Sequence, residues 1–287
     1  MKRILLFSTC LVFLNSFSQL KGKVIDINNN PIPFVNIYIQ NENSATTSEE
    51  NGTFLIKNSD KNKMLVFTVL GYENKTAKAS EDMIVVLQPS EIQLKEVVIP
   101  AWKQTKTLEI GVTNSATSQA FDNGPKIEVK FFPYDENYKK TKYIKQVVVN
   151  TDSKIEDATF KIHFYGVTKD GFPGKELLQK DFIATVKMGL KKTTFNLLDF
   201  DLRIPKTGLF VGIEKMFIAK NIFEKTTADF NTNTTRTEKK YSPMVLYDLV
   251  EREYQFVFSG GSWNKSNTQS KSKSLIYEPA IRLILTN

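Results

Sequence analysis

Apolar residues along most of the chain either alternate with polar ones or cluster in short runs, and glycine, proline and asparagine separate these runs. Alternation places successive side chains on opposite faces of a β-strand, whereas an amphipathic helix needs a period near 3.6 residues. In residues 34–39, for example, Val35, Ile37 and Ile39 fall on one face and the remaining positions on the other. Because residues 20–99 show no helical period, this part of the chain is predicted to consist of strands.

The first part of the chain predicts a small β-sandwich, because six or seven short strands are expected within residues 20–100. Asparagine tolerates left-handed backbone and proline fixes φ, so residues 28–31 are expected to turn. The preceding Asp26-x-Asn28-x-Asn30 echoes a calcium loop, but Pro31 stands where such a loop needs glycine, which favours a plain turn. The predicted strands are 23–26, 34–39, 53–56, 64–70, 83–87 and 96–99.

Residues 109–287 carry a second series of β-prone runs and are predicted to form a jelly-roll-like sandwich of two sheets. Residues 101–108 are expected to link the two units. Two polar segments, 226–240 and 259–274, lack the pattern and are expected to be long loops, either functional or mobile. The predicted strands are 127–132, 143–149, 159–167, 181–186, 193–198, 209–214, 254–258 and 281–285.

The first unit contains an ordered series of glycine, proline and aromatic motifs. They are Gly22-x-Val24-x-Asp26, Pro31-Ile32-Pro33-x-Val35-Asn36-Ile37, Glu50-Asn51-Gly52-x-Phe54-x-Ile56, Phe67, and Leu70-Gly71-Tyr72. In this order they resemble the carboxypeptidase-like regulatory domain found on exported proteins of Bacteroidetes-type bacteria. The resemblance implies a transthyretin-like sandwich of seven strands without catalytic activity. More loosely, residues 164–178 and 210–214 resemble jelly-roll domains that accompany this domain.

Residues 1–19 have the layout of a secretory signal peptide. Lys2 and Arg3 precede an apolar stretch over residues 4–13, and Ser18 provides a small residue near the expected cleavage site. The apolar stretch is about half of the roughly 20 residues that cross a bilayer as a helix. We therefore expect an exported protein without a transmembrane segment in the mature chain. Periplasmic, outer-membrane-associated and cell-surface locations all remain open.

Candidate chemistry is sparse, because the chain has one histidine, His163, and one cysteine, Cys10, which lies in the leader. A zinc site of histidine and cysteine ligands and an intrachain disulfide are thereby excluded. His163 lies between Ile162 and Phe164 in a predicted strand, with no ligand or nucleophile motif beside it. No glycine-rich phosphate loop occurs either. We expect no catalytic residue, metal or cofactor, and no polar groups gathered around His163.

The charge is unevenly divided between the two units. Residues 20–100 carry 8 basic and 10 acidic side chains, a net −2, whereas residues 101–287 carry 29 and 21, a net +8. The lysines are scattered among strands and belong to no known nucleic-acid module, so nucleic acid is not expected as a partner. A basic second unit favours acidic surface polymers, or simply a solvated lysine-rich surface.

These observations favour a non-catalytic exported envelope protein that binds or scaffolds a surface polysaccharide or another envelope protein. The tentative ligand contact is Trp263, whose flat apolar face could stack on a sugar ring; alternatively, it packs against the sandwich. A second hypothesis, which rests on the family name alone, is an accessory or regulatory subunit of a secreted hydrolase. A third is a purely structural spacer.

Overall fold

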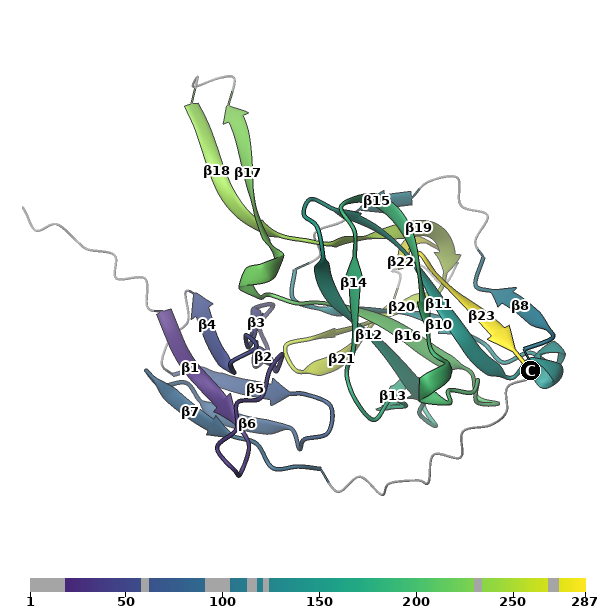
Figure 1. Cartoon of the computed structure of the whole chain (residues 1–287), viewed down its shortest axis with the longest axis horizontal. Helices are drawn as coiled ribbons and strands as arrows, with labels where there is room; N and C mark the ends of the chain where they lie inside the picture. The colour runs from purple at the N-terminus through teal and green to yellow at the C-terminus, as the bar shows by residue number, and fades with distance from the viewer. Residues whose placement is uncertain are drawn as a thin grey trace, which may run out of the picture.

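The computed structural model describes two β-sandwiches that contact one another directly (Figure 1). The expected all-β class is confirmed. The predicted leader up to residue 18, the predicted strand 96–99 and residues 101–103 of the predicted linker lie outside the described residues. The description covers residues 19–57, 62–90, 104–112, 118–120, 124–229, 234–267 and 274–287.

The first sandwich has seven strands, as the family resemblance implies, divided between a sheet of three and a sheet of four. The first sheet has the order β4-β1-β7 and the second the order β3-β2-β5-β6. The strands are β1 (Gln19–Ile25), β2 (Asn36–Ile39), β3 (Ala45–Thr47), β4 (Thr53–Lys57), β5 (Met64–Thr68), β6 (Lys75–Lys78) and β7 (Met83–Val86).

The core of the first sandwich follows the predicted alternation. Val35, Ile37 and Phe67 are fully buried between its sheets. The turn before β4 requires glycine: Gly52 has φ +77°, and a Cβ there would lie 2.5 Å from the Val24 carbonyl oxygen. The turn predicted at residues 28–31 is also present, with the Asp26 carboxylate accepting hydrogen bonds from nearby backbone N–H groups.

The second sandwich consists of two seven-stranded sheets. The sheet that faces the first sandwich, here called the docking sheet, has the order β13-β12-β16-β10-β20-β21, with β14 paired to β12. Its strands are β10 (Ile127–Phe132), β12 (Ala158–Val167), β13 (Pro173–Glu176), β14 (Phe182–Val186), β16 (Leu209–Lys215), β20 (Tyr254–Ser259) and β21 (Ser262–Asn267).

The other sheet of this sandwich has the order β22-β19-β11-β23-β8, with β15 paired to β11 and β9 paired to β19. Because β8 begins at Thr107, this sheet takes in the last two residues of the predicted linker. Its strands are β8 (Thr107–Ile110), β9 (Ser118–Ala120), β11 (Tyr143–Ser153), β15 (Gly189–Asn196), β19 (Met244–Arg252), β22 (Ser274–Pro279) and β23 (Ile281–Thr286).

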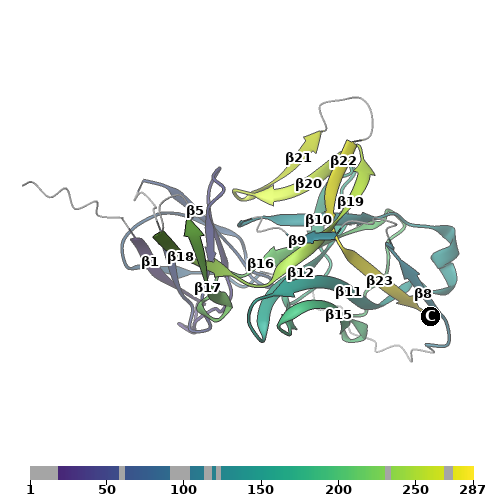
Figure 2. The same ribbon diagram turned by 90° about the horizontal axis from the view of Figure 1, so that it is seen from above.

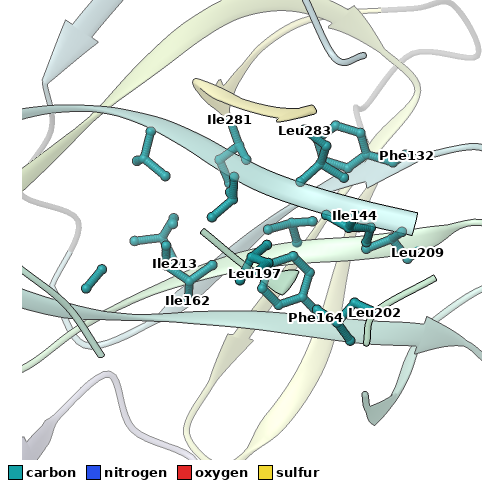
Figure 3. Packing of buried hydrophobic residues seen from close by; sticks show 14 of the residues in the cluster. Phe132, Ile144, Ile162, Phe164, Leu197, Leu202, Leu209, Ile213, Ile281 and Leu283 are labelled. Atoms are coloured by element: carbon teal, nitrogen blue, oxygen red, sulfur yellow. The ribbon is translucent and has the colours of Figure 1, made fainter. Parts of the chain in front are cut away.

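The core of the second sandwich lies between these two sheets. Ile162, Phe164 and Ile213 from the docking sheet meet Ile281 and Leu283 from β23 (Figure 3). Alternation along β12 therefore turns every second residue inward and leaves Lys161, His163 and Tyr165 on the outer face.

Helical structure in the described part of the chain is limited to three short 3₁₀ turns, η1 (Glu136–Lys140), η2 (Leu198–Phe200) and η3 (Ala219–Asn221). None of these turns has the length or apolar character to cross a membrane.

The prediction that residues 226–240 and 259–274 are loops is wrong over most of their length. β17 (Ile222–Asp229) and β18 (Thr234–Tyr241) form a separate hairpin that projects from the body of the molecule (Figure 1). β20 and β21 form a second hairpin, and its turn contains Gly260 and Gly261 with φ +59° and +88°. Apolar alternation reports one-sided burial, so it missed strands whose side chains are mostly exposed.

Candidate functional site

The first sandwich lies beside the docking sheet (Figure 2), and its contacts with Glu214 and Lys161 cover part of the outer face of that sheet. Asn36 and Tyr38 of β2 point away from the core of their own domain, yet they are only 7% and 2% exposed. Two backbone N–H groups also donate across the interface: Phe217 N to the Thr47 side-chain Oγ1 at 3.0 Å, and Asn41 N to Gly260 O at 3.1 Å. The two sandwiches therefore share a buried interface.

His163 lies within this interface, between two carboxylates that come from different strands. Its Nδ1 is 3.0 Å from Glu176 Oε2, and its Nε2 is 3.0 Å from Glu214 Oε2. A carboxylate at each ring nitrogen fits an imidazolium that donates both N–H groups. Tyr165 stacks on the imidazole, with ring centroids 5.5 Å apart and planes 13° apart.

Glu214 joins His163 to the first sandwich. Its Oε2 accepts a hydrogen bond from Asn36 Nδ2 at 2.6 Å, and its Oε1 accepts one from the Tyr38 hydroxyl. Both carboxylate oxygens therefore have donors from across the interface. A buried carboxylate is costly unless it is paired and hydrogen-bonded, and here donors from both domains meet that requirement.

A second buried cation, Lys161, also ties the domains together. Its ammonium donates to the Phe34 carbonyl oxygen of the first sandwich at 2.7 Å and pairs with Asp181 Oδ2 at 2.6 Å. The Lys161 side chain is fully buried. His163, Glu176, Glu214, Lys161 and Asp181, here called the interface network, contain three carboxylates and two cations.

The sheet leaves room for this arrangement at Gly212. In the register of β12 and β16, Gly212 lies opposite His163. A Cβ at Gly212 would lie 2.8 Å from Ile127 Cγ2 and 3.4 Å from the Tyr165 ring. A side chain at this position would therefore disturb the outer face on which the His163 and Tyr165 rings lie.

The interface network determines the charge states of its members. Burial alone would lower the pKa of His163, but the hydrogen bonds and charges of Glu176 and Glu214 outweigh burial and raise this pKa from 6.5 to about 10. Burial would raise the pKa of Glu214, whereas His163, Lys161 and Tyr38 together hold it below its usual value. Both groups are therefore charged at neutral pH.

This charge state limits what His163 can do chemically. A protonated imidazole cannot accept a proton as a general base, and it offers no lone pair to a metal ion. The two carboxylates lie at opposite ring nitrogens rather than converging on one vacant point. In the described residues, no group of three or more His, Cys, Asp and Glu side chains is arranged to hold a metal. The arrangement therefore serves best as an interdomain contact.

A cleft of about 1040 Å³ lies beside this network, between the two domains. The first sandwich contributes Tyr72, Glu73 and Asn74 to its wall, and the second contributes Gln179 and Trp263, among other residues. Aromatic rings with nearby carboxylate and amide groups suit a ligand that combines apolar faces with hydroxyl groups.

Trp263, the tentative ligand contact, lies on strand β21 rather than in a loop. Its side chain lines this cleft. Its ring packs edge-on against two others: the ring centroids are 5.1 Å apart and the planes 83° apart for Tyr165, and 5.3 Å and 67° apart for Phe258. Phe258 in turn meets Tyr38 of the first domain at 5.4 Å. Trp263 is thus half-buried against the sandwich and also borders the cleft, and its contact with a ligand stays a prediction.

A second cavity, of about 380 Å³, lies elsewhere on the second domain. Phe131, Phe210 and Phe256 provide much of its apolar wall, and Tyr254 lies at its edge with 38% of its surface exposed. This cavity does not include Trp263. Tyr254 therefore provides an aromatic residue of the same hairpin that lies outside the interdomain cleft.

The expectation that polar groups do not gather around His163 is wrong. Glu176 and Glu214 follow His163 by 13 and 51 residues, and Asn36 precedes it by more than a hundred, so no short motif unites them. Strand register brings them together. The available signal was the alternation in β12, which placed Lys161, His163 and Tyr165 on one face, but it did not show that a second domain covers that face.

Comparison with known proteins bears on the first sandwich. Residues 20–99 match the model of the CarboxypepD_reg-like domain. This part of the chain is a CarboxypepD_reg-like domain. The family is a regulatory-like β-sandwich rather than a catalytic domain. The match agrees with the family resemblance found in the motifs of the sequence.

One relative of this CarboxypepD_reg-like domain is TonB-dependent receptor P3 of Formosa agariphila, which is 31% identical over 91 residues. The matched region covers 31% of this chain and 9% of the receptor, so more than nine tenths of the receptor's length has no counterpart in the match. The similarity therefore concerns the domain and does not extend to the activity of the whole receptor.

Two solved structures show weak overall likeness to the chain. One is a structure of infectious bursal disease virus Gx strain, with a TM-score of 0.24, 10% identity and coverage of 88% of this chain and 60% of that chain. The other is BcpA, the major pilin subunit of Bacillus cereus, with a TM-score of 0.17, 11% identity and coverage of 91% of this chain and 85% of the pilin chain. Both TM-scores are too low to establish a fold shared with either structure.

Proposed function

We propose that this protein is an exported, non-catalytic envelope protein that binds a saccharide in the cleft between its two domains. The main support for this proposal is the cleft of about 1040 Å³, which is lined by the Trp263 ring and by amide and carboxylate side chains. Sugar rings present apolar C–H faces and hydroxyl edges, which match aromatic faces and polar side chains, respectively.

The assignment to the envelope has two supports. The CarboxypepD_reg-like domain is related to part of a TonB-dependent receptor, and residues 1–19 have the pattern of a secretory signal. The non-catalytic assignment is supported by the protonation of His163, whose two N–H groups are both committed to carboxylates.

Binding can be measured with residues 20–287 on an array of oligosaccharides, followed by calorimetry on each retained sugar. Trp263→Ala should weaken binding about tenfold, which corresponds to about 1.4 kcal/mol, because it removes an aromatic face from the cleft. Tyr254→Ala is the matched control, since it removes an aromatic ring of the same hairpin that lines the other cavity. The control should bind as the unaltered protein does.

Trp263 also packs against Tyr165 and Phe258, so its replacement has a structural cost. Gln179→Ala offers a second test, because Gln179 lines the cleft with an exposed side chain and its loss removes polar contacts without opening the core. Weaker binding by this variant with an unchanged melting temperature supports the proposal. Retention of no sugar, or equal affinities for all the variants, would contradict it.

A further inference from the structure

The charges that line the cleft differ in balance from those of the whole chain. The full sequence carries a formal net charge of +8, which favours acidic partners at long range. The cleft, in contrast, is lined by four carboxylates, from Glu73, Glu176, Asp181 and Glu214. The positive groups at its wall are His163 and the exposed Lys175.

The buried cations of the interface network are already committed. Both ring nitrogens of His163 are bound to carboxylates, and the Lys161 ammonium is shared between Asp181 and the Phe34 carbonyl. Counting Lys161 with the lining groups gives three positive charges against four negative ones, a net −1. An anionic ligand would therefore meet excess negative charge without a buried cation to pair with.

The geometry also shows which carboxylate a ligand would meet first. Glu73 is exposed at the cleft, and the oxygens of Glu214 are occupied by the Asn36, Tyr38 and His163 donors. Glu176 is engaged similarly, with Oε1 accepting from Phe164 N at 2.7 Å and Oε2 bound to His163. Glu73 is therefore the acidic group best placed to repel a negatively charged ligand.

We propose that the cleft selects uncharged saccharides and rejects those that carry carboxylate groups. This inference rests on the proposed function and names the class of sugar that the site takes. It is opposite to the expectation from net charge, under which acidic polymers would be the preferred partners. Attraction of an acidic polymer to the basic surface is screened by salt, whereas recognition of a neutral sugar by stacking and hydrogen bonds is not.

The test compares matched oligosaccharides of glucose, galactose and mannose with the corresponding glucuronate, galacturonate and mannuronate oligomers of equal length. Affinities are measured by calorimetry with residues 20–287 at about 50 mM and about 300 mM salt. We expect the neutral member of at least one pair to bind with an affinity that salt leaves unchanged. Its uronate counterpart should bind at least about tenfold more weakly at both salt concentrations.

Glu73→Gln should narrow the difference in affinity between the neutral oligosaccharide and its uronate counterpart, because it removes the exposed carboxylate. Glu50→Gln is the matched control, since Glu50 is an exposed acid of the same domain that lines a different cavity, and it should leave the difference unchanged. A uronate that binds as tightly as its neutral counterpart at the higher salt concentration overturns this inference and leaves the proposed function standing. Failure of every oligomer to bind overturns the proposed function and this inference together.

Discussion

At the scale of single residues, the most informative side chain is the one histidine of the chain. His163 is buried between two carboxylates, and the Tyr165 ring covers its face. Burial and ion pairing act in opposite directions on its pKa, and the two carboxylates prevail. The histidine therefore contributes a fixed positive charge to the contact between the domains, and its protonation affects stability.

The raised pKa of His163 predicts how stability depends on pH. The folded-state pKa of about 10 lies above the ordinary 6.5, so the stabilising contribution is complete below pH 6.5 and is lost as the pH rises towards 10. The free energy of unfolding, measured in urea, should fall between pH 7 and 9 by up to about 1.4 kcal/mol per pH unit. In the His163→Gln variant, the free energy of unfolding should depend less steeply on pH. An equal dependence on pH in the variant and the unaltered protein would refute the prediction.

Residue-level prediction from the sequence succeeded for one face of the strand predicted over residues 34–39. Val35, Ile37 and Ile39 are buried in the core as their alternation predicts. Asn36 and Tyr38, on the opposite face, are buried too, because a second domain covers them. Alternation identifies which residues share a face but not what that face meets, so the interface network could not be predicted.

At the scale of elements, several strands with one buried face were predicted, whereas the buried strand β19 and the exposed strands were missed. β10 was predicted with the observed bounds, and β16 extends only one residue beyond its prediction. β17, β18 and β21 were taken for loops, although the threonines of the first two favour strands. Their polar residues carry no burial signal, and their pairing depends on hairpin geometry.

The β17–β18 hairpin is predicted to open more readily than the sandwiches. Its two strands pair only with each other among the described strands, and most of their side chains are exposed. Two strands without a packed face are marginally stable. In native-state hydrogen exchange, backbone amides of Thr226 and Thr237 should therefore be protected at least about tenfold less than those of β12 and β16. Equal protection of the hairpin and the docking sheet would contradict this prediction.

At the scale of the whole molecule, the two sandwiches are joined by buried contacts as well as by the chain. Asn36, Tyr38 and the Phe34 carbonyl of one domain bind Glu214 and Lys161 of the other. The sequence predicted two units and a linker, but it gave no sign that the units contact one another. The docked arrangement also creates the cleft, because its walls come from both domains.

Glu214→Gln should weaken the coupling between the domains. It removes a buried charge that faces His163 and Lys161, and breaking such an ion pair costs about 3 kcal/mol or more. Calorimetry should show one unfolding transition for the unaltered protein and two for the variant, because the first domain separates from its partner before the second unfolds. Glu238→Gln, a half-buried member of ion pairs on the hairpin, is the control and should retain one transition. A single unshifted transition for Glu214→Gln would contradict the prediction.

The hydrogen bonds of Glu214 to Tyr38 and Asn36 also constrain how the chain can change over generations. A substitution on β2 that removes the Asn36 or Tyr38 donor leaves the buried Glu214 carboxylate of the other domain without one of its hydrogen bonds. The substituted position on β2 and Glu214 must therefore change together. Exchange of the first sandwich for that of a distant relative would therefore require the facing strands to be transplanted with it.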